Sequence, residues 1–100
     1  MKNGVQFEYS ESVKRFVEER MAEDPSYDCV YEVFEFIVSR NREVGQPLLR
    51  APEVIRRFPV LIPGSAPNLV FFYTLHGKVI RIKHAEYEED TPLPGKYWKK

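Results

Sequence analysis

The spacing of apolar residues changes abruptly near Gln46, and this change limits the folds that the chain can adopt. Before Gln46 apolar residues recur at helical spacing, whereas after it they alternate or run together between prolines. Five prolines within residues 47–67 exclude a long helix there. A chain of 100 residues with 43% hydrophobic residues has the material for one small core. The sequence therefore predicts a single α+β domain.

Two amphipathic helices are predicted before Gln46. Residues 10–21 begin with serine, a typical N-cap, and continue with Val, Phe, Val and Met at helical spacing. Residues 24–38 begin with Asp-Pro, a common helix start, and carry a second apolar stripe. The stretch 41–45 contains the Asn and Gly that end this helix. The lone Cys29 lies beside the stripe and is expected to be a small buried side chain.

Four strands are expected around these helices. Residues 5–9 alternate apolar and polar side chains, as a half-buried strand does. Residues 54–62 form a second strand, whose internal proline suggests a sheet edge or a bulge. Residues 69–75 and 78–84 form a hairpin around His76-Gly77. The predicted order is β-α-α-β-β-β, ending in a three-stranded antiparallel meander, with the helices on one sheet face because each has one apolar stripe.

The remaining segments predict no further domain and no membrane association. Residues 1–90 are expected to form the domain, and residues 91–100 a Pro-rich C-terminal tail. No apolar run reaches the roughly 20 residues that span a bilayer, and the N-terminus lacks the apolar stretch of a signal peptide. A single cysteine excludes a disulfide framework, which favours a cytoplasmic location.

Side-chain alternation in the predicted hairpin separates an apolar face from a basic one. A two-residue turn at His76-Gly77 pairs Tyr73 with Ile80 and Phe72 with Arg81. The face toward the helices then holds Leu69, Phe71, Tyr73, Ile80 and Ile82. The opposite face holds Asn68, Val70, Phe72, Arg81 and Lys83. His84 falls on the helix side in this register, and a turn one residue different would place it on the other face.

The charges are distributed unevenly along the chain, although they sum to zero. Residues 1–47 carry a net charge of −4, residues 48–84 a net charge of +5, and residues 85–100 a net charge of −1. The basic segment coincides with the predicted sheet, where it could bind phosphates and bases. The alternative is an ordinary solvated surface, on which long basic side chains cover apolar neighbours.

No metal or cofactor site is predicted. His76 and His84 are the only histidines, and the sequence has neither a CxxC nor an HExxH motif. It also lacks a glycine-rich phosphate loop. The acidic run 86–90 is more typical of a solvated terminus than of a metal site.

The layout resembles the RelE/ParE superfamily of toxins from type II toxin–antitoxin systems. The resemblance covers roughly residues 5–90, in the segments 5–10, 45–48, 55–60 and 69–84. Within the last segment, the apolar positions, Gly77 and His84 look like the pattern typical of ParE-like members. The family's fold is a short strand, a helical hairpin and a three-stranded antiparallel meander.

The resemblance implies two alternative activities. RelE-like members cleave mRNA, on the ribosome or free, and use the RNA's own 2′-hydroxyl as the nucleophile. ParE-like members bind DNA gyrase and have no such chemistry. In both groups a short antitoxin wraps the toxin, so a homodimer or a heterotetramer with antitoxin is possible. We expect a toxin that cleaves mRNA without a metal; the alternatives are a gyrase inhibitor and a degenerate protein-binding module.

The resemblance also suggests site residues. His84 stands where several relatives carry a catalytic histidine, and Tyr87 lies near the position of a C-terminal Tyr or Arg. The expected catalytic set is His84, Arg81, Arg57 and Tyr87. The expected RNA phosphate-binding set is Arg56, Lys83 and Arg50. Asn68 stands where relatives usually have Arg, and this difference favours the alternatives without nuclease activity.

Overall fold

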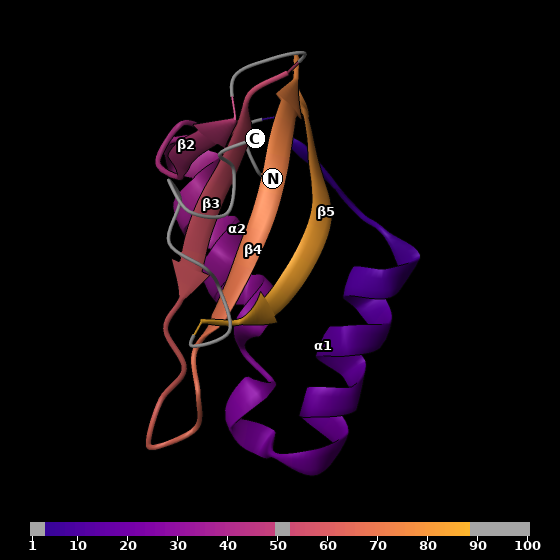
Figure 1. The fold of residues 1–100 in the computed structure, drawn as a ribbon, viewed down its shortest axis with the longest axis vertical. Helices are drawn as coiled ribbons and strands as arrows, with labels where there is room; N and C mark the ends of the chain where they lie inside the picture. The colour runs from indigo at the N-terminus through magenta and orange to yellow at the C-terminus, as the bar shows by residue number, and fades with distance from the viewer. Residues whose placement is uncertain (1–3, 50–52, 89–100) are drawn as a thin grey trace.

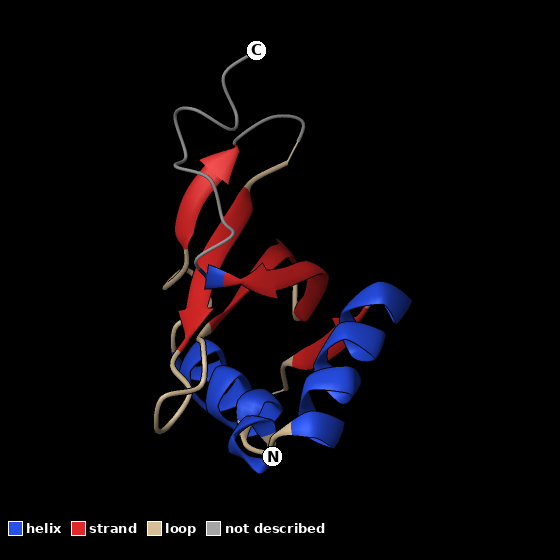
Figure 2. Ribbon diagram, turned by 60° about the horizontal axis from the view of Figure 1, so that its bottom comes forward, coloured by secondary structure: helices blue, strands red, loops and turns tan. Residues whose placement is uncertain are grey.

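Two α-helices pack on one face of a five-stranded sheet, as the computed structural model of residues 4–49 and 53–88 shows (Figure 1). The elements are β1 (Gln6–Tyr9), α1 (Glu11–Glu23), the 3-10 helix η1 (Pro25–Tyr27), α2 (Val30–Arg40), β2 (Gln46–Leu49), β3 (Ile55–Val60), β4 (Leu69–His76) and β5 (Val79–Tyr87). The strand order across the sheet is β1-β5-β4-β3-β2. The helices gather on one side of the strands (Figure 2). The predicted α+β class is confirmed.

The helix starts follow the predicted caps only in part. Ser10 caps α1, and its side-chain oxygen accepts a hydrogen bond from Val13 N at 3.2 Å. Asp24 instead caps η1 by accepting from Ser26 N at 2.9 Å. The predicted second helix is therefore divided, and α2 begins at Val30 without a side-chain cap. No helix within residues 4–49 and 53–88 is long and apolar enough to cross a lipid bilayer.

The sheet contains a strand that the prediction missed. β2 pairs antiparallel with β3, where Gln46 faces Arg57 and Pro47 faces Arg56. Proline is tolerated here because β2 is the sheet's edge and needs no second partner. Proline 59 lies beyond the part of β3 that β2 covers. This proline therefore lies where one side of β3 has no neighbouring strand among the described residues, in agreement with the sheet edge predicted from its lack of an N–H donor.

The β4–β5 hairpin differs from prediction in its turn and in its register. The turn residues are Gly77 and Lys78, and Gly77 adopts a φ of 62°, a conformation that glycine adopts without strain. Counted from the turn, the pairing is regular as far as Tyr73, which faces Ile82, but the next residue of β4, Phe72, faces His84. One residue of β5 is thus left without a partner, which defines a β-bulge.

The core forms between α2 and the predicted apolar face of the hairpin. Phe34 of α2 is fully buried, with ring centroids 4.9 Å from Phe71 and 5.8 Å from both Tyr73 and Phe58. The five residues predicted to face the helices all belong to this core cluster: Leu69, Phe71, Tyr73, Ile80 and Ile82. The shifted turn displaces the pairing by two residues, from Ile80 to Ile82 opposite Tyr73, and an even shift keeps each side chain on its face. The bulge leaves alternation along β4 unbroken, and in β5 it follows Ile80 and Ile82.

A tyrosine–carboxylate hydrogen bond joins β1 to α2. The hydroxyl of Tyr9 donates to Glu35 Oε2 at 2.6 Å, and the Tyr9 ring lies 4.7 Å from that of Tyr31. Burial of Tyr9, and then its hydrogen bond to Glu35, raise the pKa of its hydroxyl far above the ordinary value of 10.0. Burial also raises the pKa values of Tyr31 and Tyr73.

Tyr9→Phe is expected to reduce the decrease in the free energy of unfolding at alkaline pH. Folded Tyr9 stays neutral while the unfolded chain ionises, so stability present below pH 10.0 is lost as the pH rises above it. The substitution removes part of this pH dependence and costs about 2 kcal/mol at neutral pH through the lost hydrogen bond to a carboxylate. Urea unfolding from neutral to strongly alkaline pH measures both effects. Equal alkaline slopes for the variant and the parent chain would contradict the role of Tyr9.

Candidate functional site

A row of three side chains crosses the sheet face that lies away from the helices. Arg57 of β3 faces Phe72 of β4, and Phe72 faces His84 of β5. Paired residues on adjacent strands share a face, and adjacent strands lie about 4.8 Å apart. Arg57 and His84 therefore flank Phe72 from its two sides. We call this the open face, because both helices pack on the other one.

The β-bulge explains why His84 belongs to the open face. Ile82 and Ala85 of β5 are buried in the core, while both residues between them, Lys83 and His84, are exposed. Strict alternation would send one of the two inward, as the predicted register does. The extra residue instead returns His84 to the side of Arg81 and Lys83. The predicted inward position of His84 is wrong for this reason.

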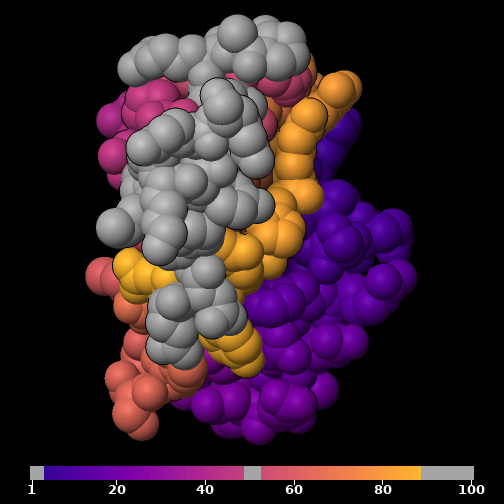
Figure 3. Space-filling model, viewed as in Figure 1, coloured from indigo at the N-terminus to yellow at the C-terminus, as the bar shows by residue number. Residues whose placement is uncertain are grey.

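The candidate site on the open face is largely accessible to solvent. The side chains of Arg81, Lys83 and His84 are 51%, 50% and 59% exposed. Phe72 is buried, with its ring 5.6 Å from that of His84. Phe72 is therefore not exposed for stacking, and the accessible ring is that of His84. Figure 3 shows the side chains of β5 reaching the surface beside α1.

Acidic side chains pair with the basic residues of the open face. Arg81 Nε lies 3.1 Å from Glu8 Oε1 of β1, and Lys83 Nζ lies 3.2 Å from Glu53 Oε1. Arg57 Nη2 lies 3.9 Å from Glu88 Oε2, and His84 Nε2 lies 3.0 Å from Glu86 Oε1. The +5 segment of the sequence thus does not form a free cationic surface, because the topology brings acids to it.

Asn68 has a positioning role at one end of the site. Its side-chain nitrogen donates to Glu88 Oε1 at 3.1 Å, and its side-chain oxygen accepts from Ile62 N at 2.8 Å. Glu88 is therefore held between Asn68 and Arg57.

Arg56 lies on the helix side of the sheet, away from Arg57. It faces Tyr73, and its Nη1 donates to the carbonyl oxygens of Glu43 and Gly45 at 3.0 and 2.9 Å. The Tyr73 hydroxyl accepts from Gly45 N at 2.9 Å and donates to the Arg42 carbonyl at 2.8 Å. Arg56 and Tyr73 together hold the connection between α2 and β2. The structure does not bring Arg56 to the other predicted phosphate-binding residues.

Two more predicted residues are not brought to the site. Tyr87 lies on the helix side, with its ring 5.6 Å from that of Phe16 and 5.4 Å from the guanidinium of Arg20. It is therefore on the face opposite His84. Arg50 lies outside the described residues.

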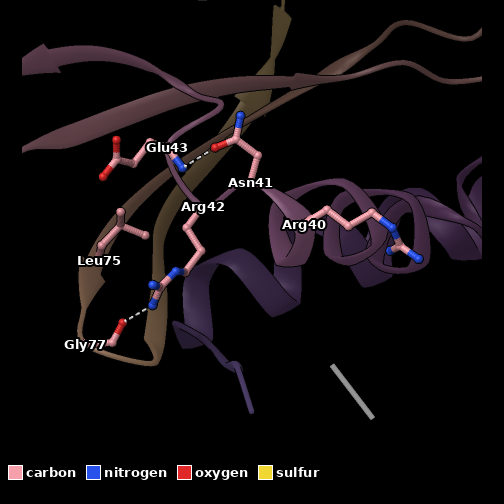
Figure 4. A pocket seen from close by; sticks show the side chains of 6 residues that line it. All are labelled: Arg40, Asn41, Arg42, Glu43, Leu75 and Gly77. Carbon is pink, nitrogen blue, oxygen red and sulfur yellow. Dashed lines mark hydrogen bonds between the residues drawn. The ribbon is translucent and has the colours of Figure 1, made fainter. Parts of the chain in front are cut away.

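A separate cavity of about 350 Å³ lies between the end of α2 and the β4–β5 turn (Figure 4). It is lined by Arg40, Asn41, Arg42, Glu43, Leu75 and Gly77. Arg42 Nη1 donates to the Gly77 carbonyl at 2.6 Å, and Asn41 Oδ1 accepts from Glu43 N at 3.2 Å. These bonds hold the cavity wall together. It is not part of the open face.

The geometry of the open face suits acid–base chemistry on a phosphate ester. An imidazole can donate or accept a proton, and the Glu86 carboxylate, 3.0 Å from His84 Nε2, holds the ring in place. Arginine and lysine side chains bind phosphate oxygens. In residues 4–49 and 53–88, no three His, Cys, Asp or Glu side chains are grouped to hold a metal ion.

The sequence contained a signal for only some of the acidic partners. Glu86 is two residues beyond His84 on the same strand, so alternation alone places their side chains together. Glu8 reaches the site because β1 pairs in parallel with β5, and Glu53 reaches it from the segment just before β3. No local pattern in the sequence indicates either of these approaches.

Comparisons with models of known families, with curated proteins and with solved structures found no match to this chain.

Neutralising single charges on the open face is expected to change stability little. Pairs this exposed contribute about 0–1 kcal/mol. Arg81→Gln, Lys83→Gln and His84→Gln should therefore each shift the free energy of unfolding by less than about 1 kcal/mol. Denaturant titration at neutral pH measures this shift. A much larger loss in any of the three variants would show that its ion pair supports the fold. The activity of that residue would then have to be tested with a different substitution.

Proposed function

We propose that the chain is a toxin of the RelE/ParE type that inhibits growth by cleaving mRNA without a metal ion. The observation that carries this proposal is the His84–Glu86 pair, 3.0 Å apart on the open face, with Arg57, Arg81 and Lys83 on the same face. The proposal also draws on the sequence resemblance, which includes a histidine at this position. Such a toxin acts in the cytoplasm and is held inactive by a cognate antitoxin.

The proposed reaction uses the 2′-hydroxyl of the RNA as its nucleophile. The 2′-oxygen attacks the adjacent phosphorus as its proton passes to water, while Glu86 holds the His84 ring. The bond from phosphorus to the 5′-oxygen breaks, and protonated His84 donates its proton to that oxygen. The products are a 2′,3′-cyclic phosphate and a 5′-hydroxyl. Arg81 and Lys83 stabilise the charge that builds up on the phosphate oxygens.

The carboxylates now paired with Arg81 and Lys83 must give way to the RNA. Both pairs are about half exposed, and such pairs contribute about 0–1 kcal/mol each. A phosphate that contacts two cations at once gains charge-assisted hydrogen bonds of comparable or greater strength. Exchange of Glu8 and Glu53 for phosphate is therefore energetically feasible.

The same pairing favours a second candidate function, non-catalytic protein binding. Three permanent cations and four carboxylates make up the paired groups on the open face, so it lacks an excess of positive charge. A surface of mixed charge attracts RNA weakly and is suited to a protein partner that presents complementary pairs. This supports the ParE-like alternative, binding of DNA gyrase, or a degenerate module that only contacts protein.

RNA cleavage distinguishes the first candidate from the second. Purified protein is incubated with mRNA, free and on translating ribosomes, and the RNA ends are mapped. We expect cuts with 5′-hydroxyl ends that persist in EDTA. His84→Gln should lower the rate by about a hundredfold or more, the typical contribution of a general acid. Lys14→Gln on α1 removes one cation from the helix side and should retain the parent rate.

The other results decide between the remaining candidates. Intact RNA together with inhibited supercoiling by gyrase would replace the nuclease with the ParE-like function. Intact RNA, unaffected gyrase and no growth arrest upon induced expression would leave the degenerate binding module. Cleavage that His84→Gln does not slow would exclude His84 as the acid.

A further inference from the structure

The outer side of α2 carries apolar side chains that the fold leaves exposed. The inward stripe of the helix, Val30, Phe34 and Val38, is fully buried. Phe36 is nevertheless 57% exposed and Ile37 is 36% exposed. Contiguous exposed apolar side chains, rather than single ones, mark contact surfaces, and Phe36 and Ile37 are neighbours on α2.

Opposite charges flank Phe36 at equal distances along the helix. Glu32 lies four residues before it and Arg40 four residues after it, so the three form one straight ridge on the helix surface. Both flanking residues are exposed. Glu32 makes no ion pair with another residue in the described parts of the chain. The ridge therefore reads as acid, aromatic, base in one direction and as base, aromatic, acid in the other.

Arg40 is already directed along this ridge. Its guanidinium lies 3.7 Å from the centroid of the Phe36 ring, and its Nη1 donates to the Phe36 carbonyl at 2.9 Å. Figure 4 shows the side chain extending along α2, away from Arg42 and Gly77. A guanidinium has five N–H donors, so most of them stay available to a carboxylate from outside.

We propose that this ridge binds a second copy of the chain, with the two α2 helices antiparallel about a two-fold axis at Phe36. Rotation by a half-turn places Glu32 of each copy beside Arg40 of the other, so both ion pairs form at once. Ridges of four-residue spacing pack side by side when helices cross at about 50°. Each Phe36 then enters the groove beside Ile37 of the other copy. The surface is self-complementary in charge, which favours a second copy over an unrelated partner.

The contact is small, so the dimer is expected to depend on concentration. α2 has 11 residues, and an interface centred on one such helix falls among those below about 1,200 Å², which are weak. Dimerisation through α2 is independent of whether the open face cleaves RNA or binds protein, because α2 lies on the other side of the sheet.

Charge exchange between the two copies tests the proposal. Sedimentation velocity over a wide range of protein concentration should show a monomer–dimer equilibrium for the parent chain. Glu32→Arg alone and Arg40→Glu alone should each weaken association by about tenfold or more, because like charges then meet twice. An equimolar mixture of the two variants should associate again, since each supplies the charge the other lacks. Combining both substitutions in one chain should also restore the dimer.

The controls separate the surface from general effects of charge. Glu23→Arg makes the same change of charge on α1 and should leave association unchanged. Far-ultraviolet circular dichroism checks that each variant is folded, which the exposure of these positions favours. A parent chain that stays monomeric at every concentration would overturn the proposal. So would a mixture of variants that remains monomeric while the parent dimerises.

Discussion

The edge-on contacts of Phe34 with Phe71 and Tyr73 fix α2 on one face of the sheet. Aromatic rings of this size contribute several kcal/mol when they leave water, more than any exposed ion pair of the molecule. Once α2 is fixed on this side, alternation along β4, and along β5 on each side of its bulge, assigns the neighbouring side chains to their faces. The open face with its charged residues is a consequence of this packing, not of an attraction among the charges.

The parts of the structure that sequence predicts are those with a repeating pattern. Helical spacing located α1 and the body of α2, and alternation located the core residues of the hairpin. The position of His84 could not be obtained in this way, because one unpaired residue in β5 reverses the face of all that follow. β2 was missed because a four-residue edge strand with a proline has no pattern of its own. Arg56 shows the same limit, since its neighbour Arg57 faces the other side.

Charge along the sequence proved a poor guide to charge in space. The basic segment 48–84 is separated from most acids by tens of residues, yet Glu8 comes from the first strand of the fold to pair with Arg81. Because such exposed pairs are weak and are screened by salt, they leave the shape of the site unchanged. They do alter what the site attracts from a distance, and this is why a nuclease and a protein-binding module both remain compatible with one set of residues.

The parallel pairing of β1 with β5 has a consequence for synthesis of the protein. β1 is made first, but the strand it pairs with comes near the end of the described chain. During translation β1 therefore waits, without its hydrogen-bonding neighbour, until about seventy further residues have been added. The helices can form early, whereas the complete sheet can assemble only after β5 leaves the ribosome. The open face, which β3, β4 and β5 form together, is therefore the last surface of the described chain to take shape.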